Sequence, residues 1–428
     1  MDITIQKQII ELIKREVVPA IGCTEPMAVA LAVAKASETL AKTPQKIEVF
    51  LSANVLKNAM GVGIPGTGMI GLPIAVALGA LIGKSQYGLE VLRDITPQSL
   101  EEGKNMIEKR CIDISLKDNV DKLYIEVICR YEAEYSKVII QKEHTQVVLV
   151  EKNGEKQFDK QESDTLDTNL QEDEVALTFS KVFDFATQTP VHDLEFMLES
   201  AELNRRAAIS SINGSYGHTV CKTVSGVNGK KYLGDSAFTH MLSMTAAACD
   251  ARMDGAFIPV MSNSGSGNQG IAATLPVLSF ADDIKCSQEQ LIRALTLSHL
   301  MVIYIKQSLG RLSALCGCVV AATGASCGIT YLMGGSKLQL SYAIKNMIGN
   351  ITGMICDGAK PSCAMKISSG VSTAMLSALM AIENKVVTSS EGIIDDDVDK
   401  SIANLTAIGS IGMEGTDKLV LQIMTKKA

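Results

Sequence analysis

The chain has 428 residues and a net charge of −7, from 40 Lys and Arg against 47 Asp and Glu. This length allows two or three domains and a sizeable buried core. The negative charge and the lack of a strongly basic run argue against a nucleic-acid-binding protein, which needs a positively charged footprint. Apolar residues make up 46% of the chain, and the composition excludes collagen-like, coiled-coil and wholly disordered proteins.

The predicted elements begin with an amphipathic helix, because apolar residues recur at helical spacing through residues 5–17. A short loop then precedes a second helix, and Pro26 is expected in its first turn, where a missing N–H has no cost. The segment Lys46–Leu51 predicts a strand. A loop rich in Gly and Pro follows at 61–68 and leads into another apolar helix.

The pattern changes after about residue 108. Apolar and polar residues alternate through 112–117, which is the period of a strand. Three β-branched runs follow, and Asn153-Gly154 is a strong turn signal. The runs are Leu123–Tyr131, Lys137–Gln141 and Thr145–Glu151. Together they predict a small antiparallel sheet of about four strands.

From residue 175 to the end the pattern is helical, with Gly-rich breaks. The helix-like stretches include Leu194–Ser210, Gln288–Gln307, Ser341–Ile355 and Val371–Asn384. We therefore predict an α+β protein, with a mainly helical body and a small antiparallel β-rich region in its N-terminal half. The predicted units are an N-terminal helical segment with an active-site loop (1–108), the β-rich region (109–158), an acidic linker (159–174) and a helical catalytic domain (175–428). The N-terminal segment is expected to pack against the C-terminal half.

Cysteine usage and the N-terminus predict a cytoplasmic protein with reduced thiols. The eleven cysteines are an odd number in a long chain, and the N-terminus has charges throughout and no apolar core of a signal peptide. Two uncharged stretches, Asn58–Gly83 and Leu312–Gly335, are long enough to span a bilayer. Both are dense in Gly, Ser and Thr, and there is no Trp for an interfacial belt. Buried helices fit better, so we expect no membrane partner, with a membrane protein as the alternative.

Three cysteines give the densest chemical signal. Cys316, Cys356 and Cys363 stand 40 and 7 residues apart. Thiolates are soft ligands that iron–sulfur clusters select, and there is no C-x-x-C pair to indicate a zinc ribbon. The alternative is that these are ordinary core cysteines, because a buried Cys is a common small hydrophobe.

Cys23 gives a second signal, because it lies just before a predicted helix N-terminus. The helix dipole and the free N–H groups there lower the pKa of a thiol and favour its thiolate form. In a functional site Cys23 would act as a base or nucleophile. The alternative is an inert thiol buried in a turn.

A Gly- and Ser-rich loop gives a third signal. Its backbone offers convergent N–H donors of the kind that bind phosphates or carboxylates, but it is not a P-loop. Its residues are Ser262, Asn263, Ser264, Gly265, Ser266 and Gly267. Asn54 and His218 are weaker candidates for substrate contact. The chain has no motif of the common hydrolases or nicotinamide enzymes.

Five short motifs occur in order along nearly the whole chain: GCTEP, IPGTG, SNSGSGNQG, LCGC, and CDG with a following Cys. As a set they resemble the iron–sulfur L-cysteine desulfidases, which are similar to the α-chain-type iron–sulfur L-serine dehydratases. The resemblance implies a β-elimination without pyridoxal phosphate. Its substrate would be a small amino acid, and L-cysteine would give pyruvate, ammonium and sulfide.

The resemblance also implies roles for the candidate residues. Cys316, Cys356 and Cys363 match the three ligands of a [4Fe–4S] cluster whose fourth iron has no protein ligand, and Cys23 matches the active-site cysteine. Cys318 and Cys327 lie close enough in sequence to confuse this assignment, and Cys327 is the first substitute for Cys316. We expect the substrate carboxylate on the loop 262–267, with Asn54 and His218 as weaker partners. A homodimer is expected.

Two alternatives remain for the reaction. The first is an L-serine dehydratase, although the serine dehydratases carry a Ser- and His-rich element where this chain has Gly22-Cys23-Thr24, which favours a thiol substrate. The second is a pyridoxal-phosphate lyase, in which the Ser- and Gly-rich loop would bind the phosphate. Lys360 or Lys366 would then bind the aldehyde.

Overall fold

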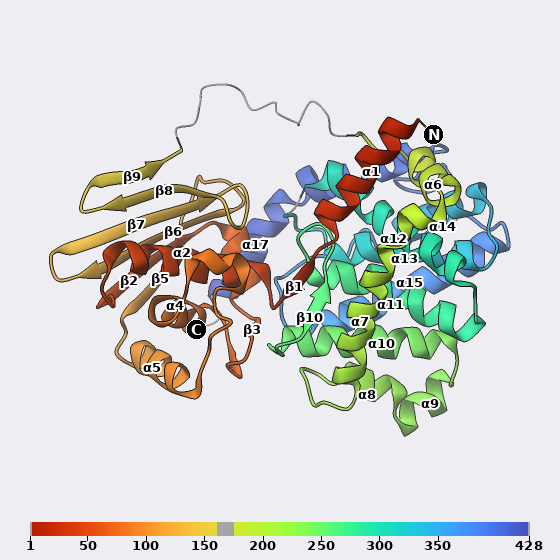
Figure 1. Cartoon of the computed structure of the whole chain (residues 1–428). Coiled ribbons are helices and arrows are strands. Elements are labelled where there is room, and N and C mark those ends of the chain that lie inside the picture. The colour runs from red at the N-terminus through yellow and green to blue at the C-terminus, as the bar shows by residue number, and fades with distance from the viewer. Residues whose placement is uncertain (1, 161–174, 311, 427–428) are drawn as a thin grey trace.

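The computed structural model describes residues 2–160, 175–310 and 312–426, and its elements form a sheet-containing lobe and a larger helical body (Figure 1). This confirms the predicted fold class. The predicted acidic linker falls almost entirely on residues 161–174, which lie outside the described residues.

The sheet lobe contains six strands in the order β5-β2-β6-β7-β8-β9. The strands are β2 (Lys46–Leu51), β5 (Ile112–Leu116), β6 (Tyr124–Tyr131), β7 (Glu134–Gln141), β8 (Val147–Lys152) and β9 (Glu155–Asp159). Strands β2 and β5 pair in parallel, and the other neighbours pair antiparallel. The sheet is therefore larger than the predicted four strands and is mixed. The reason is that the segment between β2 and β5, which includes three α-helices, forms the long crossover that a parallel pair needs. The boundary predicted at 108/109 lies between strands of this one sheet.

One face of the sheet is covered by helix α2 (Thr24–Leu40). Alternate residues of β2, namely Ile47, Val49 and Leu51, are fully buried in the same apolar cluster as Ala28 and Ala32 of α2. The short alanine side chains let the helix approach the sheet closely. The lobe is completed by α3 (Ala53–Ala59), α4 (Leu72–Leu81) and α5 (Pro97–Glu108).

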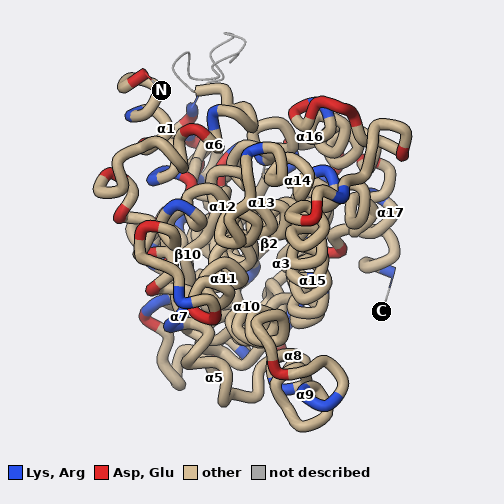
Figure 2. Tube along the Cα trace, turned by 90° about the vertical axis from the view of Figure 1, so that its right-hand side faces the viewer, with Lys and Arg blue, Asp and Glu red and all other residues tan. Residues whose placement is uncertain are grey.

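The helical body is built around α13 (Gly317–Leu332), which packs against α11, α12, α14 and α15. Its glycines permit this contact: a Cβ atom at Gly324 would lie 2.3 Å from the Ser298 carbonyl oxygen of α12. The uncharged stretch around α13 is thus a buried helix, and Figure 2 shows α13 surrounded by other helices of the body. The other helices of the body are α1 (Ile3–Glu16), α6 (Phe179–Gln188), α7 (Met197–Ile212), α8 (Val220–Ser225), α9 (Val227–Leu233), α10 (Ala237–Met253), α11 (Gly267–Ile284), α12 (Gln288–Leu309), α14 (Lys337–Ile351), α15 (Cys363–Ile382) and α16 (Val398–Ala407).

Segments that are distant in sequence join the two lobes. Strand β1 (Pro19–Ile21) pairs with β10 (Pro259–Met261), and α1 packs against α12. The N-terminal segment therefore packs against the C-terminal half, as expected. At the other end of the chain, α17 (Glu414–Thr425) packs against α3 of the sheet lobe.

One helix among the described residues, α15, is long and apolar enough to cross a membrane by length and composition. In this fold α15 packs against α10, α13 and α14, and its first residue lines the cavity described below. The second uncharged stretch predicted from the sequence contains α4, which is only 10 residues long.

Candidate active site

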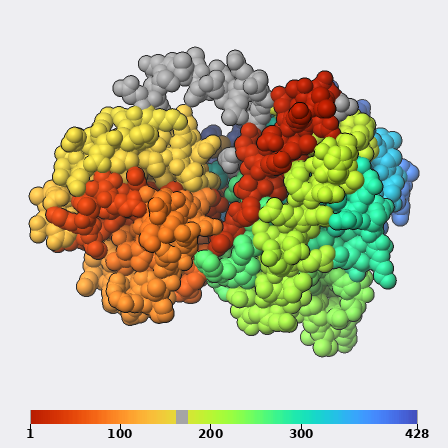
Figure 3. Space-filling model, viewed as in Figure 1, coloured from red at the N-terminus to blue at the C-terminus, as the bar shows by residue number. Residues whose placement is uncertain are grey.

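A cavity of about 140 Å³ lies between the two lobes, whose surfaces are shown in Figure 3. The sheet lobe contributes residues that include Cys23 and Glu25. The helical body contributes the Gly- and Ser-rich loop, Arg252 of α10, the start of α13, and the loop that carries Cys356 and leads into α15. All three predicted cluster cysteines line this cavity together with Cys23. The cavity therefore brings together the three candidate signals of the sequence: the predicted cluster cysteines, Cys23, and part of the Gly- and Ser-rich loop.

The backbone brings Cys316 and Cys356 side by side. Leu315 and Ile355 form an isolated antiparallel bridge, in which the Cys316 N–H donates to the Met354 carbonyl (3.0 Å) and the Cys356 N–H donates to the Ala314 carbonyl (2.7 Å). Because of this bridge, Cys316 and Cys356 are neighbours in the structure although 40 residues separate them in the sequence. Cys316 is the N-cap of α13.

The third cysteine, Cys363, is the first residue of α15, and its thiol lies 3.6 Å from the Gly358 carbonyl oxygen. Gly358 has φ +89°, and a Cβ atom there would lie 2.2 Å from the Lys57 carbonyl oxygen of α3. Only glycine therefore allows the loop between Cys356 and Cys363 to pack this closely against the sheet lobe.

The three thiols are close enough to influence each other's protonation. Burial is the main cause that raises the pKa of Cys316 to about 12, and the thiols of Cys356 and Cys363 contribute to the same rise. Among the described residues, no group of three His, Cys, Asp or Glu side chains is arranged to hold a single metal ion. A cluster has a different requirement, since each thiolate binds a separate iron and the thiols stand further apart. Three soft donors lining one cavity fit an iron–sulfur cluster.

The two alternative cysteines occupy different positions. Cys318 lines the cavity, but its thiol donates to the Lys366 carbonyl (3.0 Å), and a Cβ atom at Gly370 would lie 2.4 Å from its sulfur. Cys327 is fully buried further along α13 and does not line the cavity. Its position at the cavity therefore favours Cys316 over Cys327 as a candidate cluster ligand.

Cys23 is the N-cap of α2, as the sequence suggested, but its electrostatics differ from the expectation. Burial raises the pKa of the Cys23 thiol to about 12, while the neighbouring Arg252 guanidinium lowers it. The cost of removing a charge from water outweighs the helix dipole. Arg252 is the residue that can stabilise a thiolate here, and it is itself buried, with Nη2 donating to the Gly22 carbonyl (2.8 Å).

The predicted substrate loop divides into two parts. Ser264, Gly265 and Ser266 line the cavity, and the Thr24 hydroxyl donates to the Gly265 carbonyl (3.2 Å), which joins the loop to the start of α2. The remaining residues support the loop. Ser262 donates to the Val18 carbonyl (2.6 Å), Asn263 is fully buried and does not line the cavity, and Gly267 is the first residue of α11.

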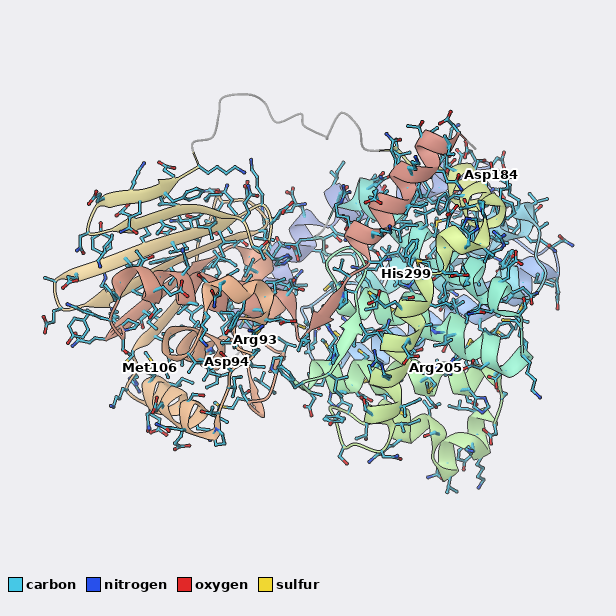
Figure 4. All side chains as sticks on the ribbon, in the orientation of Figure 1. Arg93, Asp94, Met106, Asp184, Arg205 and His299 are labelled. Atoms are coloured by element: carbon cyan, nitrogen blue, oxygen red, sulfur yellow. The ribbon has the colours of Figure 1, made fainter. Side chains whose placement is uncertain are left out.

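A buried histidine, His299, stands behind this loop within the helical body (Figure 4). Asn263 Nδ2 lies 3.0 Å from His299 Nδ1 and also donates to the His299 carbonyl (3.1 Å). His299 Nε2 lies 2.9 Å from the Thr274 hydroxyl, which donates to the Gly270 carbonyl (2.7 Å). This network assigns the ring proton to Nε2 and leaves Nδ1 as the acceptor. Burial lowers the pKa of His299 to about 3, so the ring is neutral.

Arg252 Nε and Gln269 Oε1 are buried at the cavity and have no hydrogen-bond partner among the described residues. The exposed fractions of these residues are both 4%. A Cβ atom at Gly267 would lie 2.3 Å from Arg252 Nε, and one at Gly317 would lie 3.1 Å from Gln269 Cδ. Because buried polar groups are normally paired, these atoms are suited to a bound ligand. Gln269 stands in the NQG that ends the loop motif and could have been suspected, whereas no local pattern marks Arg252.

Two predicted contact residues lie elsewhere. Asn54 donates to the Asp417 carboxylate of α17 (2.6 Å), beside the buried ion pair of Lys57 and Asp417. His218 is exposed in the loop between α7 and α8 and does not line the cavity. Both residues were predicted from their residue type and a nearby Gly-rich segment, which do not show which cavity a side chain lines.

Lys360 and Lys366 both form ion pairs with Asp357. Although burial opposes it, the Asp357 carboxylate raises the pKa of Lys366. A lysine that forms a Schiff base needs a neutral amine, so this pairing weighs against the pyridoxal-phosphate alternative.

Comparison with known proteins supports the resemblance seen in the motifs. The model of the serine dehydratase alpha chain family matches residues 86–422. A UPF0597 protein of Parabacteroides distasonis is 72% identical over 429 residues and covers 100% of both chains. UPF0597 protein BF3560 of Bacteroides fragilis is 64% identical, covering 99% of this chain and 98% of its own. A UPF0597 protein of Porphyromonas gingivalis is 59% identical over 100% of both chains.

Proposed function

The chain belongs to the serine dehydratase alpha chain family, and from this premise we propose that it is a lyase that catalyses β-elimination on L-cysteine. The products would be pyruvate, ammonium and sulfide. L-Serine is the second candidate substrate, since the family takes its name from that reaction. The proposed cytoplasmic homodimer is a further prediction.

One observation carries this proposal: three thiols, a fourth thiol beside a buried guanidinium, and two unpartnered polar atoms line the same cavity. The cavity, at about 140 Å³, suits a small molecule. Cys316, Cys356 and Cys363 would hold a [4Fe–4S] cluster. When bound, such a cluster supplies an iron without a protein ligand, which can act as a Lewis acid toward the leaving group.

The chain's own residues account for the other requirements. Cys23 is the candidate base for the α-proton, and Arg252 favours the charged form of its thiol. The start of α11, with its free N–H groups and Arg252 Nε, suits the substrate carboxylate. Cys23 would accept the α-proton as a thiolate, the form that Arg252 favours, and the C–S bond would break as sulfide leaves. Aminoacrylate remains, becomes the imine and is hydrolysed by water to pyruvate and ammonium.

Cys23 also bears on the choice between the two substrates. The position carries a thiol beside Arg252, where the serine dehydratases carry a Ser- and His-rich element. This difference supports cysteine as the first substrate to test.

The test is an anaerobic reconstitution. The protein would be purified without oxygen, supplied with iron and sulfide, and analysed for bound iron, and then pyruvate would be measured from L-cysteine and L-serine. We expect about four irons per chain, with pyruvate and sulfide from L-cysteine. The Cys356→Ala variant should lose both iron and activity, whereas Cys23→Ser should keep the iron and lose activity.

Cys286→Ala provides the matched control, because Cys286 follows α11 and does not line the cavity. It should keep both iron and activity. If L-serine is the only substrate that gives pyruvate, the cluster proposal stands and the substrate is L-serine. If the reconstituted protein binds no iron, the cluster proposal is wrong and the three cysteines are core residues.

A further inference from the structure

Within the described residues, the sequence Ser-x-x-Gln begins three helices, at Ser266, Ser287 and Ser336. In α12 the N-cap Ser287 N–H donates to Gln290 Oε1 (2.9 Å), and in α14 the Ser336 N–H donates to Gln339 Oε1 (2.9 Å). Both are capping boxes, in which the glutamine oxygen satisfies the N-cap backbone.

The third helix, α11, departs from this pattern. The Ser266 N–H donates to the Asn263 carbonyl (3.0 Å), so the glutamine is not needed to complete the cap. Gln269 Oε1 is buried without a partner among the described residues, and the side chain lines the cavity. The same local sequence therefore leaves an acceptor at the cavity only in α11.

A second acceptor is created by the histidine network. The Asn263 Nδ2 group donates both of its hydrogens to His299. The other amide atom, Asn263 Oδ1, therefore faces Ser264 as an acceptor. The Ser264 hydroxyl donates its hydrogen to this oxygen (2.8 Å). Since a hydroxyl has one hydrogen, Ser264 Oγ can present only lone pairs to the cavity, which it lines. Ser264 also has φ +48°, an uncommon value for a residue with a side chain at a functional loop.

We propose that Gln269 Oε1 and Ser264 Oγ form the recognition site for the α-ammonium group of the substrate. An ammonium carries three donors and no acceptor, so it matches two acceptors whose hydrogens are absent or already committed. This inference rests on the proposed function and deepens it, because it restricts the substrates to amino acids with a free α-amino group. His299 and Asn263 are positioning residues for Ser264.

The two unpartnered atoms, Arg252 Nε and Gln269 Oε1, then give the cavity one hydrogen-bond donor and one acceptor at different places. Arg252 Nε is a donor beside Gly267 at the start of α11, and Gln269 Oε1 is an acceptor beside Gly317 at the start of α13. A carboxylate suits the first and an ammonium suits the second. The amino acid would thus be held at two points, and its side chain would be directed by them toward the cysteines.

The test compares two ligands that differ in the ammonium group alone: L-cysteine and 3-mercaptopropionate. Their dissociation constants would be measured by anaerobic titration calorimetry in the Cys23→Ser background, which should bind L-cysteine without turning it over. KM for L-cysteine and the inhibition constant of 3-mercaptopropionate would be measured with active protein. In Gln269→Leu, the affinity for L-cysteine should fall tenfold or more, since a hydrogen bond to a charged group is lost. The affinity for 3-mercaptopropionate should change less than twofold.

Two further variants guard against a general loss of structure. Gln269→Glu keeps the length and the acceptor, so it should retain the preference for L-cysteine. Gln290→Leu makes the same change at the equivalent position of α12, away from the cavity. It should lower the melting temperature slightly and leave both ligands unaffected.

The outcomes separate this inference from the proposed function. An equal loss of affinity for both ligands in Gln269→Leu, or no loss for either, would overturn the ammonium site even if the wild-type protein produces pyruvate. If the wild-type protein produces no pyruvate from any amino acid, the proposed function fails. The calorimetric preference for L-cysteine over 3-mercaptopropionate would still decide the ammonium site.

Discussion

The buried histidine behind the substrate loop allows a quantitative prediction. His299 is fully buried, and burial lowers its pKa from 6.5 to about 3. In the folded protein the ring therefore stays neutral over a pH range in which the unfolded chain binds a proton. Because the unfolded state then binds more protons, the free energy of unfolding falls as the pH decreases from about 6.5 toward 3.

The magnitude follows from the two pKa values. Between pH 7 and pH 5, His299 should reduce the free energy of unfolding by about 2 kcal/mol. His299→Gln keeps a donor toward Thr274 but has no titrating group, so this part of the pH dependence should disappear. Other groups contribute equally to both proteins, and the difference between them isolates His299.

The assay is urea unfolding followed by circular dichroism at several pH values between 7 and 5, on wild-type protein and the variant. A second variant, His240→Gln, gives a control of opposite sign. Hydrogen bonding to Asp283 raises the pKa of His240, so its stabilising contribution is present at low pH and is lost as the pH rises through the folded value. If wild-type and His299→Gln protein lose stability in parallel, the ring is not held neutral and the assigned network is wrong.

Two substitutions test packing at the site and between the lobes. Gly267→Ala would place a Cβ atom 2.3 Å from Arg252 Nε, so we expect a folded protein with at least tenfold lower activity, measured as pyruvate release. Gly353→Ala, where nothing lies within 4 Å, is the control and should retain activity. Asp417→Ala leaves Lys57, which is 1% exposed, as an unpaired buried charge and should lower the free energy of unfolding by about 3 kcal/mol.

The ion-pair prediction has its own control. Glu202 pairs with Arg206 on the exposed surface of α7, so Glu202→Ala should change the free energy of unfolding by less than about 0.5 kcal/mol. Equal effects of Asp417→Ala and Glu202→Ala would mean that the contact between α17 and α3 does not depend on a buried charge. Full activity of Gly267→Ala would place Arg252 outside the binding machinery.

Local sequence was sufficient for the elements whose signal is periodic. The strand predicted at Lys46–Leu51 has those bounds in the structure, because alternation of apolar and polar residues is a property of the strand itself. The start of α2 at Thr24 was foreseen for a similar reason, since Pro26 suits a first helical turn. The chemistry of thiolate ligands also marked the three cysteines before any geometry was known.

Only the tertiary structure decided what each element and side chain meets. Periodicity reports which face of a strand is buried and not which strand lies beside it, so the parallel pairing of β2 with β5 was missed. The pKa of Cys23 depends on desolvation by all surrounding residues and so was misjudged from its position at a helix start. No local pattern marks Arg252, and the loop motif that contains Gln269 does not show that its side chain faces a cavity. Their unpartnered atoms indicate a ligand site only because folding buries both of them at the same cavity, away from water.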